Sequence, residues 1–386
     1  MKLTRAAKLV IQATPEAFQP TVDAYTKAYN LTCQVGWDAK ETNGVSLHHL
    51  TYQTTREYLP SQLAISARMK ATESLKAVAT KIKQVGNATC PKSKQCSIRY
   101  DANSYTLKLL TNDVSIKTVS GRLKFKLLIP DYFKQYINWK WTSADLFIRD
   151  GKVFLHVIFE KEIADTPSNE KFVGIDRGIV NLAVTSNNQF FGGQQVKTVS
   201  KRYERLRSEL QSKGHSGKRH FRRIAMKETR FRRDANHCVA KQIVNSLEAG
   251  STMILEKLKG IRQRVRMRKE QRKQIHKWNF CQLEEFLVYK GMAKGIGTDY
   301  VNAAYTSQKC SRCGHISRSN RPHQSIFCCT VCHFKLNADL NASRNIRNNH
   351  LDAISHPSRA DVNQPSRCSQ NPIGLVEQAA GSLAQR

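Results

Sequence analysis

The chain has 386 residues, and its 63 Lys and Arg residues against 30 Asp and Glu residues give a formal net charge of +33. This excess makes nucleic acid the leading partner, because self-repulsion would weaken a compact fold unless a polyanion neutralised it. No stretch approaches 18 consecutive apolar residues and the basic N-terminal segment has no apolar signal core, so we expect no membrane span and no secretion. The composition predicts a cytoplasmic protein that acts on nucleic acid.

The first 170 residues predict a helical segment placed between strands of a β module. Residues 3–11 predict a short strand, and residues 15–85 are helical in pattern, with a helix that begins at Ser61 after Pro60. Residues 86–96 predict a loop. Strands are then expected at residues 105–109, 123–127, 146–148 and 153–159, and Asp150-Gly151 is typical of a hairpin turn between the last two.

The rest of the chain predicts an α/β fold. Short apolar strands are expected at residues 172–175, 180–185 and 189–191, followed by a long basic helical stretch over residues 200–247. A buried strand at residues 252–255, a helix over residues 278–294 and a strand near Val301 complete the pattern. Three antiparallel strands, a helix and further strands with helices predict a fold that resembles ribonuclease H. Residues beyond about 349 are polar and predict a flexible tail.

More than half of the excess charge lies in one window. Residues 197–277 hold 25 Lys and Arg residues against 7 Asp and Glu residues, which is 18 of the 33 excess charges. Basic runs occupy residues 218–223, 230–233 and 262–273, with Tyr203, Phe221 and Phe231 interleaved. The pattern favours contacts with phosphates, with aromatic rings available for stacking, over the alternative of a solvated basic helix face.

Two carboxylates end apolar strands in the same local context. Asp176 follows Gly174-Ile175, and Glu256 follows Ile254-Leu255. Either carboxylate alone is more typical of a helix cap or an ion-pair partner, because a charge at the C-terminal end of a buried strand is costly unless it is paired or binds a metal. Asp339, which opens a short predicted helix, is a third candidate. Three such carboxylates that converge can hold two Mg²⁺ ions and hydrolyse a phosphodiester bond.

The cysteine pattern predicts a structural zinc site. Cys310 and Cys313 form one CxxC pair, Cys329 and Cys332 form a second, and 15 residues separate the pairs. This spacing is typical of a zinc ribbon, whereas a redox pair needs one CxxC that opens a helix. Gly314 allows the tight turn after the first pair. The four thiolates complete the tetrahedral shell, although His315, His323 and His333 could substitute as ligands. The adjoining Cys328 is expected to be a bystander, and the remaining six cysteines are expected to be ordinary thiols.

Taken together, these motifs resemble the TnpB family of transposon-encoded RNA-guided nucleases, which are related to type V CRISPR effectors. The resemblance covers residues 172–346 and includes the helix expected over residues 278–290. Its motifs are Gly174-Ile175-Asp176-Arg177-Gly178, Leu255-Glu256-Lys257-Leu258, residues 305–314 (YTSQKCSRCG) and Ala338-Asp339-Leu340-Asn341-Ala342. Asn337 departs from the family pattern, because many relatives carry an acid there. Residues 1–170 match only in architecture and in Leu59-Pro60-Ser61-Gln62.

The resemblance implies a domain order. A wedge-like, β-barrel-like module would take in residues 1–12 and 86–170, with a helical recognition lobe inserted over residues 13–85. A ribonuclease H-like (RuvC) nuclease domain would occupy residues 171–305 and 336–348, interrupted by the zinc ribbon at residues 306–335, with the tail at residues 349–386. Asp176, Glu256 and Asp339 would be the catalytic magnesium ligands, and Cys310, Cys313, Cys329 and Cys332 the zinc ligands.

The resemblance also implies a function. Family members bind a guide RNA, recognise a short motif beside the target and cut double-stranded DNA at one Mg²⁺-dependent site. Base pairing reads the sequence while the protein contacts the nucleic-acid backbone, and a strongly basic protein suits this role. We expect a monomeric protein in the ribonucleoprotein and a prokaryotic, nucleoid-associated location. The alternatives are a non-catalytic nucleic-acid-binding regulator, which needs no acidic triad, and a guide-independent RuvC-type resolvase or transposase, which needs no large N-terminal module.

Overall fold

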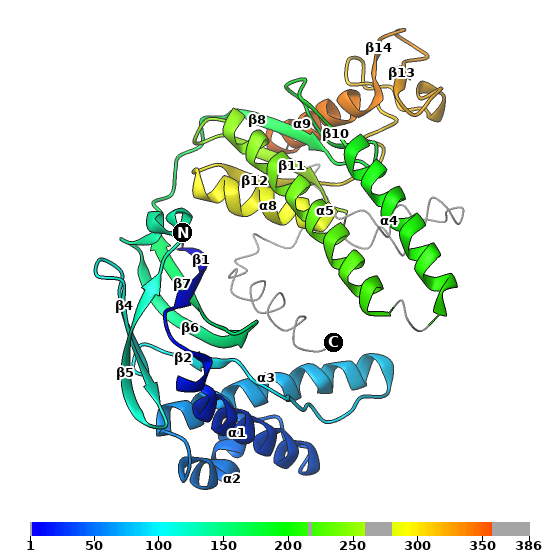
Figure 1. Ribbon diagram of the computed structural model, residues 1–386. Helices are drawn as coiled ribbons and strands as arrows, with labels where there is room; N and C mark the ends of the chain where they lie inside the picture. Colours follow the sequence, from blue (N-terminus) through cyan, green and yellow to red (C-terminus); the bar gives the residue numbers. More distant parts are fainter. Residues whose placement is uncertain (1, 215–217, 259–279, 357–386) are drawn as a thin grey trace. The chain divides into compact units, whose positions relative to one another are not determined.

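The structure is a computed structural model, and it describes residues 2–214, 218–258 and 280–356. The chain divides into two compact units, one that extends to Ile163 and a second that begins at Ala164 (Figure 1). Within the described ranges, no helix combines the length and the apolar character that crossing a membrane requires.

The first unit is built on a seven-stranded antiparallel sheet that is nearly closed. The strand order is β2-β6-β7-β1-β5-β4-β3. The two edge strands approach each other, because the Tyr100 and Tyr105 ring centroids lie 6.4 Å apart and Tyr105 also lies 4.9 Å from Trp141 of β6. The strands are β1 (Lys2–Ile11), β2 (Ile98–Tyr100), β3 (Tyr105–Lys108), β4 (Asp113–Thr118), β5 (Gly121–Leu128), β6 (Lys140–Arg149) and β7 (Lys152–Glu162).

Local pattern accounts for most of these strands. The predicted hairpin turn is confirmed, since Asp150 and Gly151 have φ values of 50° and 70° and Arg149 pairs with Lys152. Strand β4 was not predicted, although Val114 and Ile116 alternate with polar residues and are buried. Its signal was short and lay next to turn residues, so only its pairing with β3 and β5 defines it.

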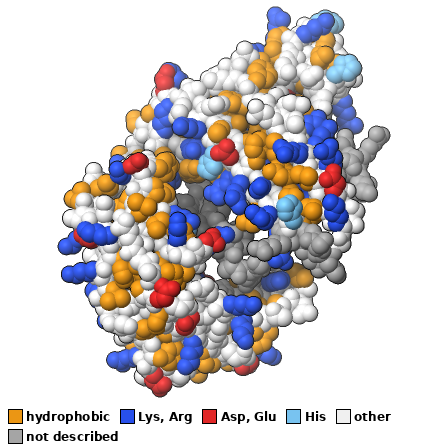
Figure 2. Space-filling view, viewed as in Figure 1, with side chains coloured by type: hydrophobic (Ala, Val, Ile, Leu, Met, Phe, Trp, Pro, Cys, Tyr) orange, Lys and Arg blue, Asp and Glu red, His pale blue; other side chains and the backbone are white. Residues whose placement is uncertain are grey.

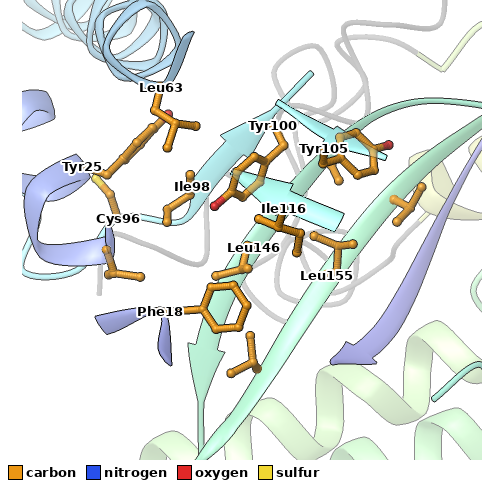
Figure 3. Close-up of a cluster of buried hydrophobic side chains, with 14 of the residues drawn as sticks. Phe18, Tyr25, Leu63, Cys96, Ile98, Tyr100, Tyr105, Ile116, Leu146 and Leu155 are labelled. Atoms are coloured by element: carbon orange, nitrogen blue, oxygen red, sulfur yellow. The ribbon is translucent and has the colours of Figure 1, made fainter. Parts of the chain in front are cut away.

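Three α-helices, preceded by a short 3-10 helix at Pro15–Ala17, lie between β1 and β2 in the sequence. They are α1 (Gln19–Asp38), α2 (Gly44–Arg56) and α3 (Ser61–Val85). The start predicted at Ser61 is confirmed, and a second break occurs where the Asn43 side chain accepts a hydrogen bond from the Val45 amide at the start of α2. Side chains from helices and sheet share one hydrophobic core (Figure 3), which includes Phe18, Tyr25, Leu63, Ile98, Tyr100, Ile116, Leu146 and Leu155.

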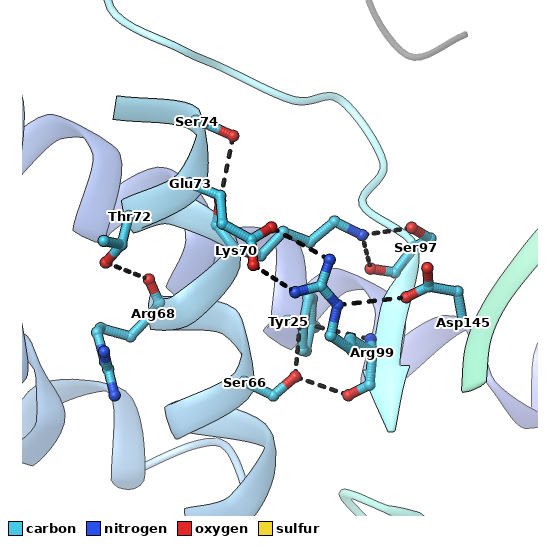
Figure 4. A network of polar contacts seen from close by, with 10 residues as sticks. All are labelled: Tyr25, Ser66, Arg68, Lys70, Thr72, Glu73, Ser74, Ser97, Arg99 and Asp145. Atoms are coloured by element: carbon cyan, nitrogen blue, oxygen red, sulfur yellow. Dashed lines mark hydrogen bonds and ion pairs between the residues drawn. The ribbon is translucent and has the colours of Figure 1, made fainter. Parts of the chain in front are cut away.

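A polar network also joins α3 to the sheet (Figure 4). The Arg99 guanidinium on β2 lies 2.6 Å from the Glu73 carboxylate and 3.9 Å from that of Asp145. Nearby, the Lys70 ammonium donates to the Ser97 carbonyl at 2.8 Å, and the Ser66 hydroxyl donates to the Arg99 carbonyl at 2.6 Å. The helices and the barrel-like sheet are therefore fixed to each other by both apolar and charged contacts.

The second unit contains a mixed five-stranded sheet with the order β10-β9-β8-β11-β12. Strands β8, β9 and β10 pair antiparallel, whereas β8, β11 and β12 pair parallel, so the expected succession of strands is confirmed. The strands are β8 (Phe172–Asp176), β9 (Asn181–Thr185), β10 (Phe190–Gly192), β11 (Thr252–Glu256) and β12 (Gly297–Val301). The C-terminal ends of β8 and β11 consequently lie at one edge of the sheet.

The described α-helices of this unit are α4 (Gln194–Ser212), α5 (Lys218–Ser246), α8 (Phe280–Ala293) and α9 (Ala338–Ser355), and a short 3-10 helix lies at Arg318–Asn320. The single basic helix that the sequence predicts is therefore two helices, and the predicted basic run at residues 262–273 lies outside the described residues. Helices α5 and α8 pack against the sheet through Ala240, Ile243 and Leu287. Helix α9 is not short, and it continues to Ser355 through the start of the predicted tail, whose residues 357–386 lie outside the description.

Gly174 allows α9 to lie directly against β8. A Cβ atom at this position would stand 2.1 Å from the Ser343 carbonyl oxygen and 2.7 Å from the Arg347 backbone nitrogen. Any side chain at this position would therefore push the helix away from the strand. Since Asp176 ends β8 and Asp339 lies in the first turn of α9, the close packing brings two of the predicted site residues onto adjoining elements.

Candidate catalytic and metal sites

Asp176 and Glu256 end neighbouring parallel strands. Leu255 of β11 pairs with Ile175 of β8, so the next residue of each strand, Glu256 and Asp176, lies at the same sheet edge. Glu256 is only 8% exposed and Asp176 is partly buried. The apolar strands that precede them are buried in the core, and this burial holds both carboxylates at the edge.

Asp339 reaches this edge from α9. The Asn337 side chain caps the helix by accepting hydrogen bonds from the Asp339 and Leu340 amides. The Asn181 amide, at the start of β9, donates to an Asp339 carboxylate oxygen at 2.8 Å. An Arg321 terminal nitrogen lies 3.6 Å from the other carboxylate oxygen. No local sequence pattern marks Asn181 or Arg321, because their contacts with Asp339 join distant segments.

The three carboxylates share one electrostatic environment. Burial raises the pKa of Asp176 well above its ordinary value, and the nearby carboxylates of Glu256 and Asp339 raise it further. Burial also raises the pKa of Glu256, against the opposing effects of Thr306 and Arg177. Such an arrangement of partly buried acids favours a bound cation, because the cation would relieve their mutual repulsion.

The hydroxyl of Thr306 orients Glu256. It donates to a Glu256 carboxylate oxygen at 2.5 Å. The backbone around Thr306 is held in turn by α9, whose buried Asn345 donates to the Thr306 carbonyl at 2.8 Å and to the Lys309 carbonyl at 2.6 Å. Asn341, one helical turn earlier, accepts from the Ser311 amide at 3.0 Å. The helix that carries Asp339 therefore also positions the segment that contacts Glu256.

The four predicted zinc ligands converge in the structure. The Cys310 and Cys332 sulfurs lie 3.7 Å apart, those of Cys313 and Cys329 lie 3.6 Å apart, and all four lie within 4.8 Å of one another. Tetrahedral zinc with bonds of about 2.3 Å places its sulfur ligands roughly 3.8 Å apart, so the spacing fits. A disulfide would need a separation near 2.05 Å. Among the described residues, these thiols alone form so compact a group of metal-type ligands.

Each CxxC pair is followed by a residue with a left-handed backbone. Gly314 has φ of 81° and its amide donates to the Cys310 carbonyl, while His333 has φ of 55° and its amide donates to the Cys329 carbonyl. The predicted turn at Gly314 is thus confirmed, and His333 makes the same turn after the second pair. Cys328 lies on β13 (Ile326–Cys328), which pairs with β14 (Lys335–Asn337), and it is not part of the thiol cluster.

Burial opposes ionisation of Cys329, but hydrogen bonds outweigh this effect. Donation from the Cys332 and Val331 amides, and contacts with the Cys313 and Cys332 thiols, lower the pKa of Cys329 to about 6. A thiolate is the form that binds zinc. Asn320, fully buried, links the two turns by donating to the Gln308 and His315 carbonyls and accepting from the Thr330 amide. Its role was not predicted, because no local pattern marks it.

Two family models match the chain between residues 156 and 346. The model described as "Probable transposase" matches residues 156–259, and the model described as "Cas12f1-like, TNB domain" matches residues 280–346. The first match contains β8 and β11 with Asp176 and Glu256. The second contains the four cysteines and Asp339.

Curated proteins of two names, Cas12f and TnpB-like, and a further endonuclease are similar to the chain. The chain is 29% identical to the CRISPR-associated endodeoxyribonuclease Cas12f1 of Sulfoacidibacillus thermotolerans, over 55% of this chain and 54% of the relative. It is 32% identical to a TnpB-like protein of Aquifex aeolicus, over 44% of this chain and 58% of the relative. A putative RNA-guided DNA endonuclease, InsQ of Escherichia coli, is 28% identical over 51% of this chain and 53% of the relative. The chain thus spans little more than half the length of these relatives.

The fold is also similar to that of a solved effector. A Cas12f1 structure, solved as a complex with single-guide RNA and target DNA, superimposes with a TM-score of 0.62 at 17% identity. The similarity covers 86% of this chain and 82% of that chain. At this identity the comparison supports the shared architecture of the chain.

Proposed function

We propose that the chain, which is similar to TnpB-like and Cas12f proteins, is an RNA-guided DNA endonuclease of a transposon. The proposed reaction is hydrolysis of target DNA after guide RNA pairing and recognition of a short target-adjacent motif. The observation that carries the proposal is that Asp176 and Glu256 lie side by side at one sheet edge. Asp339 is also near enough to raise the pKa of Asp176. A protein that only bound nucleic acid would gain nothing from acids set among basic residues.

The donor set at this edge suits magnesium. Asp176, Glu256 and Asp339 offer carboxylate oxygens, which are the ligands that Mg²⁺ takes in nuclease sites. Two bound Mg²⁺ ions would supply an activated water and stabilise the leaving 3′ oxygen. In this proposal Thr306 holds Glu256 in one orientation, and Asn181 and Arg321 hold Asp339. The three acids are the proposed catalytic residues and magnesium ligands.

We assign the parts of the chain accordingly. Residues 171–305 and 336–355 form the proposed RuvC-like, ribonuclease H-like nuclease domain, which includes all of α9. Residues 306–335 form a zinc ribbon in which Cys310, Cys313, Cys329 and Cys332 hold structural Zn²⁺. Residues 1–12 and 86–170 form the wedge-like module and residues 13–85 the helical recognition lobe.

The proposed partners are guide RNA and double-stranded target DNA. We propose that the protein is monomeric in the ribonucleoprotein and that it acts in the prokaryotic cytoplasm, at the nucleoid. On the face shown in Figure 2, Lys and Arg side chains visibly outnumber Asp and Glu. Much of the charge lies on α4 and α5, where Lys201, Arg222 and Arg230 are exposed. Such a surface suits binding to a nucleic-acid backbone.

The RNA that accompanies the protein tests the proposal. The protein would be purified from cells that carry its native locus, and the bound RNA would be sequenced. One dominant RNA with a constant scaffold and a variable end supports guided cleavage. Heterogeneous RNA or none would favour a guide-independent resolvase or transposase, or a nucleic-acid-binding regulator.

A further inference from the structure

A pocket lies between the zinc ribbon and α9, within the second unit. Its volume is about 390 Å³. The ribbon contributes Arg312 and Phe334, α9 contributes Arg344, Arg347 and Asn348, and Ser186 lines it from the residue after β9. The catalytic proposal uses none of these side chains.

The pocket concentrates positive charge that the described protein does not neutralise. Arg312, Arg344 and Arg347 form no ion pair with any carboxylate among the described residues. Other arginines of this unit do: Arg207 and Arg232 contact the buried Glu228, and Arg321 contacts Asp339. Three arginines that line one cavity without an acid partner favour an anionic ligand with several acceptor oxygens.

The pocket also presents an aromatic ring and a hydroxyl. The Arg312 guanidinium lies 6.0 Å from the centroid of the Phe334 ring, so cation and ring are neighbours. Phe334 is partly exposed and offers a flat apolar surface of the kind on which bases stack. The Ser186 hydroxyl accepts a hydrogen bond from the Gly174 amide at 3.1 Å, which leaves its own proton for a ligand. Phosphate and base chemistry thus meet in one cavity.

The pocket lies near the acids along two elements. Arg344 and Arg347 follow Asp339 on α9 by five and eight residues, which is about 7.5 and 12 Å along the helix axis. Ser186 is hydrogen-bonded to Gly174, two residues before Asp176 on β8. A strand bound at the acids would therefore have neighbouring nucleotides within reach of the pocket.

We infer that this pocket binds a phosphate and base of the single-stranded DNA that flanks the scissile phosphodiester. The inference rests on the proposed endonuclease function and adds a residue-level subsite to it. Arg312 and Arg344 are positioning residues here, because they would hold the strand in register and take no part in bond cleavage. Single-stranded DNA is favoured over the guide RNA because the pocket adjoins the proposed cutting site.

The test measures whether the affinity for DNA depends on particular phosphates, and whether that dependence requires these arginines. Single-stranded DNA substrates would carry one neutral methylphosphonate linkage at successive positions around the cut, and their affinity would be measured for the ribonucleoprotein in a Glu256→Gln background. The pocket variant is Arg312→Gln with Arg344→Gln. Arg318→Gln with Lys335→Gln removes the same charge from exposed ribbon positions outside the pocket. Arg344→Lys keeps the charge, and zinc content reports folding.

We expect a neutral linkage at one or two positions beside the cut to weaken binding about tenfold in the parent and in the control, as for loss of a charge-assisted hydrogen bond. The pocket variant should bind more weakly throughout and lose this sensitivity. A plot of the logarithm of its binding constant against the logarithm of salt concentration should also become less steep, by about 0.7 in slope for each lost phosphate contact. Equal linkage sensitivity in the pocket variant and the parent, with zinc content intact, would overturn the inference.

The two proposals fail differently. Absence of cleavage by the unmodified ribonucleoprotein on every substrate would count against the endonuclease, whereas the binding profile would still decide whether the pocket holds a phosphate. If the double variant loses zinc, the single variant Arg344→Gln becomes the deciding one, because Arg344 lies on α9 and not in the ribbon. Loss of linkage sensitivity in Arg344→Gln, with its retention in Arg344→Lys, supports the pocket, and an unchanged linkage profile in Arg344→Gln contradicts it.

Discussion

The guanidinium of Arg177 lies 2.5 Å from the carboxylate of Glu284, and its side chain is fully buried. Its second terminal nitrogen donates to the Glu256 carbonyl at 2.7 Å, and the first also donates to the Phe280 carbonyl at 3.3 Å. One side chain on the residue after Asp176 thus ties the ends of β8 and β11 to α8. This arrangement fixes the spacing of the two strand ends that carry the proposed catalytic acids.

Removal of the Glu284 carboxylate should destabilise the protein. Glu284→Ala leaves the buried Arg177 charge without its partner, and because Glu284 is itself 27% exposed we expect a loss of about 2–3 kcal/mol, below the range for fully buried pairs. Thermal unfolding measures the effect. Glu285→Ala removes the same charge from the exposed neighbouring position and should change little. Equal midpoints for the two variants would show that the pair contributes no stability.

Asp176→Asn should stabilise the metal-free protein while abolishing cleavage. Burial and the neighbouring carboxylates raise the pKa of Asp176, so its charged form is unfavourable in the folded state. In EDTA the variant should unfold roughly 2–4 °C above the parent, a shift that corresponds to about 1 kcal/mol. A midpoint below that of the parent in EDTA would contradict the account of this site.

The same substitution predicts a pH dependence. Because the folded pKa of Asp176 lies above the unfolded one, the unfolded chain ionises first as pH rises, and the parent loses stability across that interval. The advantage of Asp176→Asn in EDTA should therefore be absent below the ordinary Asp pKa and complete above the raised value. An advantage that shrinks with rising pH would have the wrong sign.

Cys313→Ser should release zinc and loosen the ribbon. The variant removes one of four sulfurs held within 4.8 Å, and zinc binding is coupled to folding of such small domains. Atomic spectroscopy should find about one zinc per chain in the parent and much less in the variant. Cys328→Ser is the matched control, because that thiol adjoins Cys329 without joining the cluster. Equal zinc content in Cys313→Ser and Cys328→Ser would refute the assignment.

Gly174→Ala should be among the most damaging single-methyl additions in the second unit. The added Cβ would meet the Ser343 carbonyl at 2.1 Å, so α9 must move, and we expect a cost of about 3 kcal/mol or more. Gly192→Ala places its methyl where nothing lies within 4 Å and serves as the control. Comparable unfolding midpoints for both variants would mean that α9 does not depend on this close approach.

Local sequence patterns predicted the elements and the site residues that carry their own signal. Asp176 and Glu256 followed from apolar strands that end in an acid, and Cys310 followed from its spacing to the other cysteines, because these features are contiguous in the chain. The ion pair of Arg177 with Glu284 joins residues 107 positions apart, and no local pattern specifies it. Asn320 and Asn345 were missed for the same reason, since buried amides bind backbone that only the fold brings near.

Turn residues predicted only the local pairing of strands, as in the hairpin at Asp150-Gly151. The near closure of the first sheet depends on contacts between edge strands, as at Tyr100 and Tyr105, and no local pattern specifies them; only the family resemblance implied a barrel-like module. The division of the basic stretch into α4 and α5 was hidden because both halves share one composition.

Cleavage by a reprogrammed ribonucleoprotein tests the central claim most directly. The protein would be assembled with its RNA scaffold carrying two unrelated guide segments in turn, and each complex would be given a plasmid that holds both matching targets, with Mg²⁺ or with EDTA. We predict that the cut moves from one target to the other with the guide, requires the divalent ion and disappears in Glu256→Gln. Cleavage that ignores the guide, or that persists at the parent rate in Glu256→Gln, would contradict the account.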